Sequence, residues 1–568
     1  MTTVKKKLIE TSLPLEAINA ASAREKSIRH GHPSTLHLYW SRKPLATARA
    51  VLFAQLVDDP ASRPDEFPTV ESQDAERARL HALMEKLIIW ENSNDEKLLE
   101  QAREEIRKSN DGKLPAVVDP FAGGGSIPLE AQRLGLESHA SDLNPLAVLI
   151  NKALIEIPPK FAGWSPMFPG VAEEQSSWLR AEGLAADVQH YGQWLRDEAE
   201  KRIGHLYPKV TAPGGTEHTV IAWKWARTVI SPNPANPIET PLVNSWWLSK
   251  KKGKEAWVKA TVVDGQVQYE VQHNADGPKK DEDGTRVGRG GISLADGTPI
   301  SADYIKEQGV QRGLGSHLIA IVAEDKKGRL YLSPNAEHMA ASLVAAPDDI
   351  PLQEIPHNPR SHWTPAYGLT KFSDLFTSRQ LVTLTTLSEL VPEARSKVLE
   401  DALAAGIPAV ERLEDGGVGA EAYADAVATY LALGVSRTAD YNNALCTWHT
   451  TRDTVTHLFT RQAIPMAWDY IETNVLSNSS GNFLGQLKIV AKVIQRLPAE
   501  INGEVKQINA TSRDYAGLVV STDPPYYDNI GYSDLSDFFY SGHKSKSDVL
   551  VVVFVVWVLV LGWLGCFT

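Results

Sequence analysis

Residues 116–145, AVVDPFAGGGSIPLEAQRLGLESHASDLNP, decide the fold that the sequence predicts. The apolar run 116–118 indicates a short buried strand, and a glycine-rich turn leads from it into a helix at 127–135. Ser126 is the expected N-cap of this helix and Gly135 its C-cap. A second strand at 138–141 then ends at an acidic residue. Because this order of elements begins a parallel sheet, the sequence predicts an α/β fold with a Rossmann-like sheet.

The glycine-rich turn predicts a nucleoside cofactor. Asp142 follows Asp119 by 23 residues, close to the spacing at which a second-strand carboxylate binds a ribose hydroxyl. Gly123 and Gly125 fit the first two glycines of a dinucleotide site, but Pro128 stands at the third. No P-loop pattern occurs either. The pattern Asp-Pro-Phe-x-Gly-x-Gly is instead typical of S-adenosylmethionine sites, and the alternative is a tight turn in an unrelated α/β unit. The predicted cofactor residues here are Asp119, which orders the turn, with Phe121, Gly123, Gly125, Asp142 and Asn144.

A second motif lies near the other end of the chain, at 521–540, STDPPYYDNIGYSDLSDFFY. The apolar run 518–520 precedes it, and two consecutive prolines must end that strand. Asp523 can accept a hydrogen bond from an exocyclic amine, and the carbonyl of Pro524 can accept another. The ring of Tyr526 can stack on a base extruded from a duplex. The predicted catalytic residues are therefore Asp523, Pro524, Pro525 and Tyr526, with Tyr527 as a possible further contact to the ring.

Composition restricts the class of protein. The chain has 568 residues, a formal net charge of −12 and only two cysteines, so several domains are expected and a disulfide framework is excluded. The negative net charge argues weakly against a protein that binds nucleic acid over most of its surface, although it permits a local basic channel. The N-terminal residues carry no apolar signal segment. These features favour the cytoplasm.

The two motifs divide the chain. Roughly 375 residues separate Asn144 from Ser521, which is far too long for one loop and requires a large mixed α+β insert. We expect an amphipathic helix at 187–206, a hairpin at 258–271 that turns at Asp264-Gly265, and alanine-rich helices at 395–434. The expected regions are 1–58 (N-terminal, with a cofactor-motif helix), 59–113 (helical excursion), 114–160 (first part of the catalytic domain), 161–500 (insert), 501–540 (catalytic segment) and 541–568 (hydrophobic tail).

The pair of motifs resembles the amino-group DNA methyltransferases, and the rest of the chain resembles the large adenine-specific members that carry an insert with a zinc ribbon. The Lys43-Pro44-Leu45 segment is similar to a further cofactor motif of these enzymes, which implies that Lys43 and Pro44 belong to the cofactor site. The stretches that carry this resemblance are 30–52, 219–229, 245–259, 367–381, 461–474 and 523–540. The resemblance implies S-adenosylmethionine as cofactor, double-stranded DNA as partner and the exocyclic amine of adenine as methyl acceptor.

The sequence departs from this family in the insert. The ribbon would place cysteine pairs near 231–236 and 293–296, where this chain has none. Serine and asparagine cannot replace thiolate ligands, so we predict no structural zinc and no metal in the site. The local basic run 250–254, beside Trp246, Trp247 and Trp257, could meet a nucleic-acid backbone, but a solvated loop is the more economical interpretation.

The tail changes character after Tyr540. Residues 549–567 carry no charge and are long enough to cross a membrane, so they indicate either a shifted reading frame that truncates the enzyme, a C-terminal anchor or a buried pair of strands. Three functions therefore remain open: a DNA adenine methyltransferase, a truncated remnant that binds cofactor or DNA without catalysis, and a methyltransferase for RNA or protein amide nitrogen. The membrane is a partner only if the tail is an anchor, and the sequence makes no prediction of oligomeric state.

Overall fold

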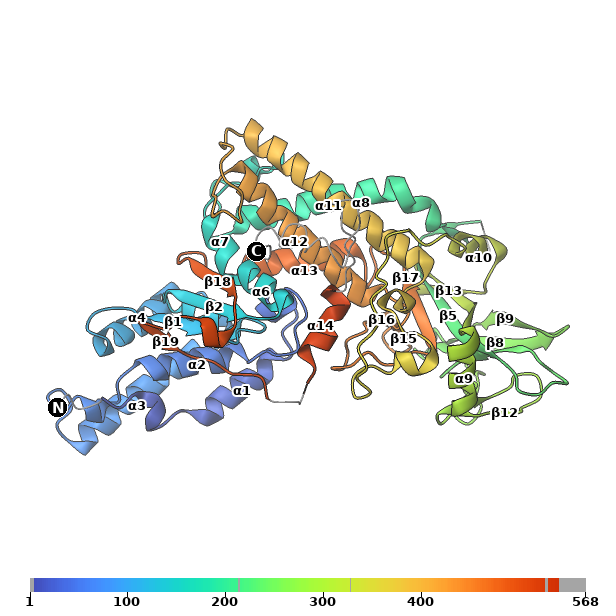
Figure 1. Ribbon diagram of the computed structural model, residues 1–568, viewed down its shortest axis with the longest axis horizontal. Coiled ribbons are helices and arrows are strands. Elements are labelled where there is room, and N and C mark those ends of the chain that lie inside the picture. Colours follow the sequence, from blue (N-terminus) through green and yellow to red (C-terminus); the bar gives the residue numbers. More distant parts are fainter. Residues whose placement is uncertain (1–4, 213–214, 327, 527–529, 541–568) are drawn as a thin grey trace.

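A parallel sheet of four strands forms one side of the molecule (Figure 1). The computed structural model describes residues 5–212, 215–326, 328–526 and 530–540. The sheet contains β1 (Ala116–Asp119), β2 (Ser138–Asp142), β18 (Gly503–Gln507) and β19 (Leu518–Val520), in the order β18-β2-β1-β19. All three pairings are parallel. Numbered along the chain, the strand order is 3-2-1-4, which reverses direction between β1 and β19. The α/β class and the parallel sheet are therefore confirmed.

The glycine-rich turn after β1 leads into α5 (Ser126–Arg133), as the sequence predicted. The N-cap position, however, belongs to Gly125, which has a φ of 80° and offers no capping side chain. The prediction that Ser126 caps the helix is wrong, because its hydroxyl donates instead to the carbonyl of Lys43 at 2.7 Å. The turn is thereby tied to an N-terminal segment that is distant in sequence.

The N-terminal region packs on the sheet and covers one of its faces. Its helices share a buried apolar cluster with Val117 of β1 and with Ile127 and Leu134 around α5. A buried ion pair between Arg49 and Glu130, 2.5 Å between Nε and Oε2, joins α2 to α5. These helices are α1 (Leu15–Glu25), α2 (Leu45–Leu56), α3 (Val70–Leu87) and α4 (Glu96–Ser109).

Helices from the insert lie against the opposite side of the sheet domain. After β2 the chain forms α6 (Pro145–Asn151), a π-helical turn (Lys152–Glu156) and α7 (Ile157–Lys160), and Tyr430 of the insert donates a hydrogen bond to the carbonyl of Ala153 at 2.7 Å. The absence of a side chain at Gly192 and Gly434 lets the long helices of the insert pack closely. A Cβ atom at either position would lie 2.2 Å from the side chain of Leu487. These helices are α8 (Glu182–Ile203), α11 (Ser378–Ala404), α12 (Ala420–Tyr441) and α13 (Phe483–Ile494).

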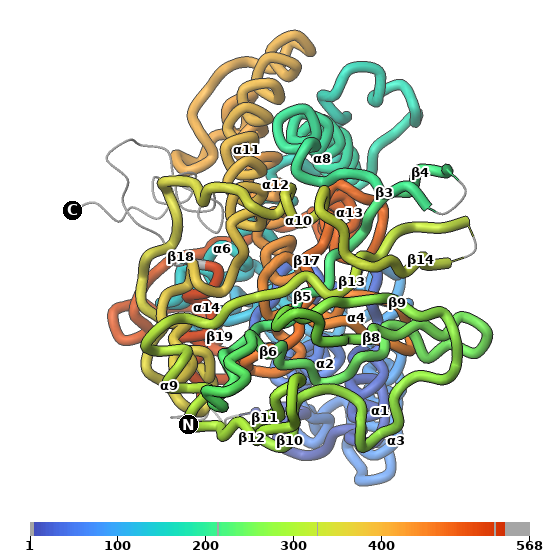
Figure 2. The backbone as a smooth tube through the Cα atoms, turned by 90° about the vertical axis from the view of Figure 1, so that its right-hand side faces the viewer, coloured from blue at the N-terminus to red at the C-terminus, as the bar shows by residue number. Residues whose placement is uncertain are grey.

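The rest of the insert is built on an antiparallel sheet, on the right of Figure 1 and facing the viewer in Figure 2. Arg379 of α11 forms a buried ion pair with Glu472 of β17 at 2.9 Å and lies 4.1 Å from the ring of Trp223. The chain between β2 and β18 therefore contains both helices and antiparallel strands. The sheet contains β14 (Gly328–Leu332), β13 (Gly315–Asp325), β5 (Val220–Ile230), β17 (Asp469–Thr473) and β6 (Glu239–Leu242).

The predicted hairpin is present as β8 (Ala256–Val263) and β9 (Gln266–Gln272). Asp264 and Gly265 both have positive φ, as a two-residue hairpin turn requires. In the basic run beside it, Lys250 lies 3.5 Å from Asp283 and Lys251 lies 2.7 Å from Asp453, so local carboxylates neutralise two of these cations. The remaining short elements of the insert are β3 (Val210–Thr211), β4 (Glu217–His218), β7 (Trp247–Ser249), β15 (Thr447–His449), β16 (Thr454–Thr456) and α10 (Ala336–Ser342).

The two segments at the positions of the expected ribbon lie side by side without cysteines. Asn233 and Asn236 donate hydrogen bonds from their amide nitrogens to Oδ2 of Asp296, at 2.7 and 3.2 Å. Hydrogen bonds from Thr298, followed by those from Asn233 and Asn236, lower the pKa of Asp296. The part of the chain that the structure describes contains no cluster of side chains able to hold a metal ion. The elements that follow the first of these two segments or flank the second are β10 (Arg286–Val287), β11 (Gly290–Ile292), β12 (Pro299–Ile300) and α9 (Ala302–Arg312).

The last described helix, α14 (Tyr532–Tyr540), lies between the parallel sheet and the insert (Figure 1). Its residues Leu535, Phe538 and Phe539 are buried. Residues 541–568, on which the three interpretations of the tail depend, lie outside the described residues, and so does Tyr527. Within the described ranges, no helix combines the length and the apolar character that crossing a bilayer requires.

Candidate functional site

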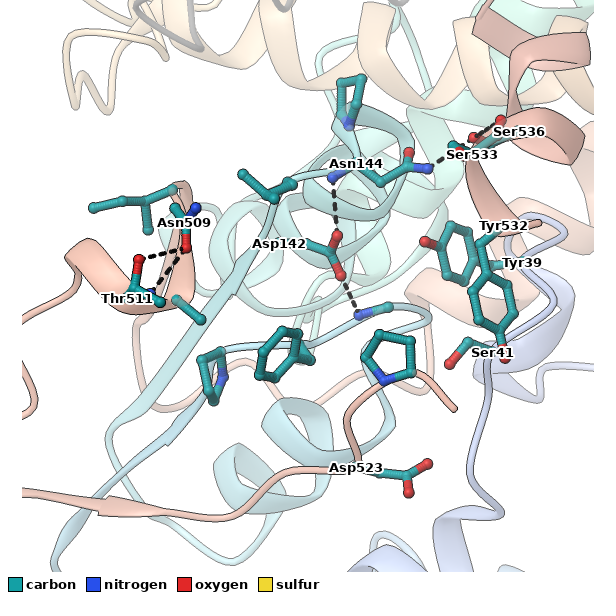
Figure 3. A pocket seen from close by; sticks show the side chains of 18 of the residues that line it. Tyr39, Ser41, Asp142, Asn144, Asn509, Thr511, Asp523, Tyr532, Ser533 and Ser536 are labelled. Atoms are coloured by element: carbon teal, nitrogen blue, oxygen red, sulfur yellow. Dashed lines mark hydrogen bonds between the residues drawn. The ribbon is translucent and has the colours of Figure 1, made fainter. Parts of the chain in front are cut away.

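A cavity of about 620 Å³ opens at the carboxyl ends of the parallel strands (Figure 3). It lies where the strand order reverses between β1 and β19, which is the usual ligand site of such sheets. The two motifs that the sequence singled out both reach it. Of the residues predicted for the site, those that line the cavity are Phe121, Gly123, Asp142, Asn144, Asp523 and Pro525.

Asp142 holds the glycine-rich turn in place. Its Oδ2 accepts a hydrogen bond from the backbone N–H of Gly123 at 2.9 Å, and its Oδ1 accepts one from the N–H of Asn144 at 2.9 Å. Each carboxylate oxygen retains a second lone pair, so the side chain can still accept hydrogen bonds from a ligand's hydroxyl groups. Burial raises the pKa of Asp142. The residue predicted to bind ribose therefore lies in the cavity and also orders its floor.

Asp119 connects the two motifs from behind the cavity. Its Oδ1 accepts hydrogen bonds from the N–H of Phe121 at 3.0 Å and from the hydroxyl of Thr522 at 2.7 Å. Burial raises the pKa of this carboxyl group to about 7. The residue itself is not among those that line the cavity. Its place fits the predicted role of ordering the turn, because it fixes the glycine-rich turn and the strand end before Asp523 to each other.

An N-terminal segment that the sequence only partly identified forms one wall. Gly124 donates a hydrogen bond from its N–H to the carbonyl of Ser41 at 3.1 Å. The ring of Tyr39 stacks on Tyr532 of α14, with 6.3 Å between ring centroids and 12° between planes. Gly123 lies so close to this segment that a Cβ atom would be 3.3 Å from the Tyr39 ring. The run of aromatic residues before Lys43 was the available signal, but only the three-dimensional contact shows that it belongs to the site.

Lys43 lies on the Asp-Pro-Pro-Tyr motif, although the resemblance implied a place in the cofactor site. Its Nζ is 2.9 Å from Oδ2 of Asp523 and donates a hydrogen bond to the hydroxyl of Tyr526 at 2.9 Å. The hydrogen bond with Tyr526 is the main cause of a raised pKa for Lys43. Pro44 is the N-cap residue of α2. Neither Lys43 nor Pro44 lines the cavity at the strand ends; both line a smaller cavity of about 150 Å³ behind the glycine turn.

The Asp-Pro-Pro-Tyr motif leaves the sheet at the edge of the cavity, as the two prolines require. The hydroxyl of Tyr526 donates to Oδ1 of Asp523 at 3.2 Å, so both carboxylate oxygens of Asp523 have a partner. About 59% of the Tyr526 side chain is exposed, which leaves a ring face available for stacking. Pro525 lines the cavity, whereas Pro524 does not.

The far wall comes from α14. The side-chain amide of Asn144 donates to the hydroxyl of Ser536 at 2.7 Å, which joins the end of β2 to this helix. Asp537 also lines the cavity, and burial, followed by the neighbouring Asp534, raises its pKa to about 6. Ser536 and Asp537 lie within the second motif, but no role could be assigned to them from the sequence, because that role depends on where α14 docks.

The charged side chains among the described lining residues of the cavity are all negative. Asp142, Asp523 and Asp537 line it, and no lysine, arginine or histidine is among its described lining residues. Aromatic rings of Tyr39, Phe121 and Tyr532 complete the wall. Such a lining suits a neutral or positively charged ligand with an apolar part and disfavours a polyphosphate, which proteins bind with basic groups.

Comparison with known proteins gives one match. A family model described as "Protein of unknown function (DUF1156)" matches residues 12–83. This region includes Tyr39, Ser41 and Lys43, which contact the glycine-rich turn or the Asp-Pro-Pro-Tyr motif. No curated protein and no solved structure matches the chain.

Proposed function

We propose that this protein is an S-adenosylmethionine-dependent methyltransferase that acts on the exocyclic amine of adenine in DNA. One observation carries the proposal: a single acidic and aromatic cavity is lined by the glycine-rich turn, by Asp142 and by Asp523 of the Asp-Pro-Pro-Tyr motif. The cofactor motif and the amine-binding motif are almost 400 residues apart in sequence. A chance occurrence of either motif would not bring both to the same strand ends.

The residues present fit this cofactor better than a dinucleotide or nucleoside triphosphate. S-adenosylmethionine carries a sulfonium and an ammonium against one carboxylate, so its net charge is positive at neutral pH. The carboxylates and aromatic rings of the cavity suit that charge, and the missing basic side chains argue against a pyrophosphate. Asp142 would hold the ribose hydroxyls, Gly123 would lie beneath the methionine part, and Phe121 would contact the cofactor. Gly125, which was predicted beside Gly123, lines the smaller cavity behind the glycine turn instead.

The chemistry requires positioning more than activation. When bound, the cofactor supplies a methyl group on a sulfonium, which is already a good leaving group. The substrate nitrogen forms the new carbon–nitrogen bond as the carbon–sulfur bond breaks, and the nitrogen loses one proton. Asp523 and the Pro524 carbonyl would accept hydrogen bonds from the amine and orient its lone pair. About 30% of the Asp523 side chain is exposed, so the released proton has a path to solvent.

DNA is the preferred substrate class because most of residues 1–540, including parts of the insert, resembles the adenine-specific DNA enzymes. The exposed ring of Tyr526 suits a base that has left the duplex. RNA and protein amide nitrogen can be methylated at similar motifs, so the test includes both. The composition with two cysteines favours a reducing compartment such as the cytoplasm.

Transfer of a tritiated methyl group from S-adenosylmethionine tests the proposal. Unmethylated genomic DNA, total RNA and a protein extract are offered separately to the full chain. We expect label in DNA that appears as N6-methyladenine after digestion. The Asp523→Ala variant should lose transfer while its cofactor affinity, measured by calorimetric titration, stays within about twofold of the wild type, because Asp523 orients the amine and not the cofactor.

Asp514→Ala is the matched control. Asp514 is an exposed aspartate just before β19, and its side chain accepts a hydrogen bond from the N–H of Ala516. It should keep both activities. Equal loss of transfer and cofactor binding in Asp523→Ala would contradict the role of Asp523. Cofactor binding without transfer to any of the three acceptors would reduce the protein to a non-catalytic binder, and label in RNA or protein alone would replace the DNA assignment.

A further inference from the structure

The outer side of α13 carries a row of basic residues. Lys488 and Lys492 are four residues apart, so they project from one side of the helix, and Arg496 continues the row just beyond the helix end at Ile494. Lys488 and Arg496 are exposed, and Lys492 is half-buried. No acidic residue occurs in the sequence from 483 to 499. The charged groups that α13 presents to solvent are therefore all positive.

The loop that follows α1 adds two further cations beside this row. Lys26 and Arg29 in this loop are both exposed. Gly31 approaches the end of α13 so closely that a Cβ atom there would lie 2.7 Å from Cδ of Arg496 and 3.1 Å from the carbonyl oxygen of Lys492. This approach brings a loop of the N-terminal region against a helix from the far end of the insert.

Two helices of the insert hold this loop in place. Arg437 of α12 donates from Nη1 to the carbonyl of Thr35 at 2.7 Å and from Nη2 to Oε1 of Gln486 of α13 at 3.1 Å. Burial raises the pKa of Tyr441 at the end of α12, and the charge of Arg29 is among those that oppose the rise, so Arg29 also lies near the insert. The loop and α13 therefore form one surface, which exists only when the N-terminal region packs on the insert.

Carboxylates leave this surface positive. None of its five cations forms an ion pair with a carboxylate in the part of the chain that the structure describes. Hydrogen bonding to Arg24 lowers the pKa of the nearby Glu91 most, and the charge of Arg496 has a weaker effect in the same direction. Glu91 is thus already paired with Arg24. The five cations, which we call the basic surface, are Lys26, Arg29, Lys488, Lys492 and Arg496.

Helix stability does not account for this row. Like charges four residues apart on a helix repel each other, so Lys488 and Lys492 destabilise α13 slightly. The helix dipole favours a cation at Lys492 in the last turn, but not at Lys488 one turn earlier. The chain as a whole carries a formal net charge of −12, so a cluster of unneutralised cations is not a consequence of its composition. Such a cluster indicates an anionic partner.

We infer that the basic surface binds the phosphate backbone of the DNA duplex that contains the target adenine. The inference rests on the proposed function and specifies where that substrate docks. The surface extends to the Asp-Pro-Pro-Tyr motif, because Lys26 and Lys43 line the same cavity of about 150 Å³ and Lys43 donates a hydrogen bond to Tyr526 at 2.9 Å. A duplex on this surface would therefore lie beside the exposed ring that suits an extruded base. Contacts from lysine and arginine to phosphates position a duplex without reading its sequence.

DNA binding by the full chain at several salt concentrations tests this inference. A fluorescein-labelled duplex of mixed sequence is titrated in an anisotropy assay with S-adenosylhomocysteine present. The double variant Lys488→Gln, Lys492→Gln should reduce the slope of log K against log salt by about two, so its loss of affinity relative to the wild type should shrink by about twelvefold between about 50 and 200 mM salt. Arg29→Gln, on the loop, should reduce the slope by about one. In methyl transfer, the KM for DNA should rise while kcat stays the same, because these residues lie outside the cavity where transfer is proposed.

The double variant Lys306→Gln, Arg312→Gln is the matched control. It removes the same charge from α9, which lies well away from α13 in both Figure 1 and Figure 2. It should keep the wild-type slope and the wild-type KM for DNA. The melting temperature and the affinity for S-adenosylhomocysteine should be unchanged in every variant, which shows that each one folds.

If the wild type methylates DNA but the α13 and loop variants keep its salt slope and its KM, this inference is wrong and the proposed function stands. If the wild type transfers no methyl group to DNA, the proposed function and this inference fail together. An RNA duplex of the same sequence and vesicles of phosphatidylglycerol are titrated in parallel. Tighter binding of either one than of DNA, with the same loss in the same variants, would assign the basic surface to that partner and refute the inference.

Discussion

Replacement of Lys43 tests whether this residue binds the cofactor, as the resemblance implied, or pairs with Asp523, as its position in the structure indicates. In the structure, Lys43 and Tyr526 each take one lone pair on a different carboxylate oxygen of Asp523, and they compete there with the substrate amine of the proposed mechanism. The side chains of Lys43 and Asp523 are 37% and 30% exposed, so their ion pair is screened by solvent and stabilises the closed arrangement by about 0.2–1 kcal/mol. At that energy, roughly 15–40% of molecules are open at any moment, and the apparent affinity for substrate is reduced to about that fraction of its value for the open form.

Lys43→Met should therefore lower the KM for DNA by about two- to sixfold and leave the dissociation constant of S-adenosylmethionine unchanged. The raised pKa of Lys43 keeps the side chain charged at neutral and mildly alkaline pH, so the ratio of KM values should be the same at pH 7 and at pH 9. The assay is tritiated methyl transfer over a range of DNA concentrations, at about 50 and 200 mM salt, because a lysine that contacted phosphate would show a strong salt dependence.

Lys306→Met is the matched control, since Lys306 forms a similar exposed pair with Asp303 on α9, 3.2 Å between Nζ and Oδ1. It should change neither constant. A weaker affinity for S-adenosylmethionine in Lys43→Met, with the KM for DNA unchanged or higher, would refute the reasoning. That result would return Lys43 to the cofactor site that the resemblance implied.

Two further substitutions test the glycine-rich turn. Asp119→Asn should keep both hydrogen bonds to Oδ1 but remove a buried acid whose pKa is about 7. Between about pH 4 and 7 this carboxyl group is ionised in the unfolded wild type but still protonated in the folded protein. The free energy of unfolding of the wild type therefore falls as pH rises through that range, by at most about 1.4 kcal/mol per pH unit. Urea unfolding should show that the stability of the variant relative to the wild type rises over the same range. Gly125→Ala places a Cβ atom 2.8 Å from Asn151 at a φ of 80° and should lower the free energy of unfolding by more than about 1–2 kcal/mol. The control is Gly112→Ala, which also has positive φ but no neighbour within 4 Å and should cost less. Equal costs for the two variants would contradict the packing argument.

Local sequence patterns predicted the frame of the site well. Alternation of apolar runs and glycine turns located β1, α5 and β2, because buried parallel strands are nearly uniformly apolar and their turns need residues that adopt positive φ. The apolar run before Asp523 located β19 for the same reason. The hairpin at β8 and β9 followed from Asp264-Gly265 alone. Each of these signals lies within about ten residues of the element it predicts.

Contacts between distant segments could not be predicted in this way. Lys43 precedes Asp523 by 480 residues, and no local pattern states that their side chains meet. The stacking of Tyr39 on Tyr532 is equally remote. The missing cysteines predicted a ribbon without metal, but they did not predict that Asp296 would join the two segments through Asn233 and Asn236. Those arrangements depend on packing of the whole chain.

The docking of α14 explains why the insert belongs to the site and is not an appendage. Phe538 stacks on Phe376 of the insert, with 5.7 Å between ring centroids, and meets Phe459, also of the insert, edge-on at 5.2 Å. The opposite face of the same helix supplies Ser536 and Asp537 to the proposed cofactor cavity. Burial of these aromatic rings fixes α14, so the insert determines the position of one wall of that cavity. A polar change at Phe376 should therefore reach the cofactor site by displacing α14, although Phe376 does not line that cavity.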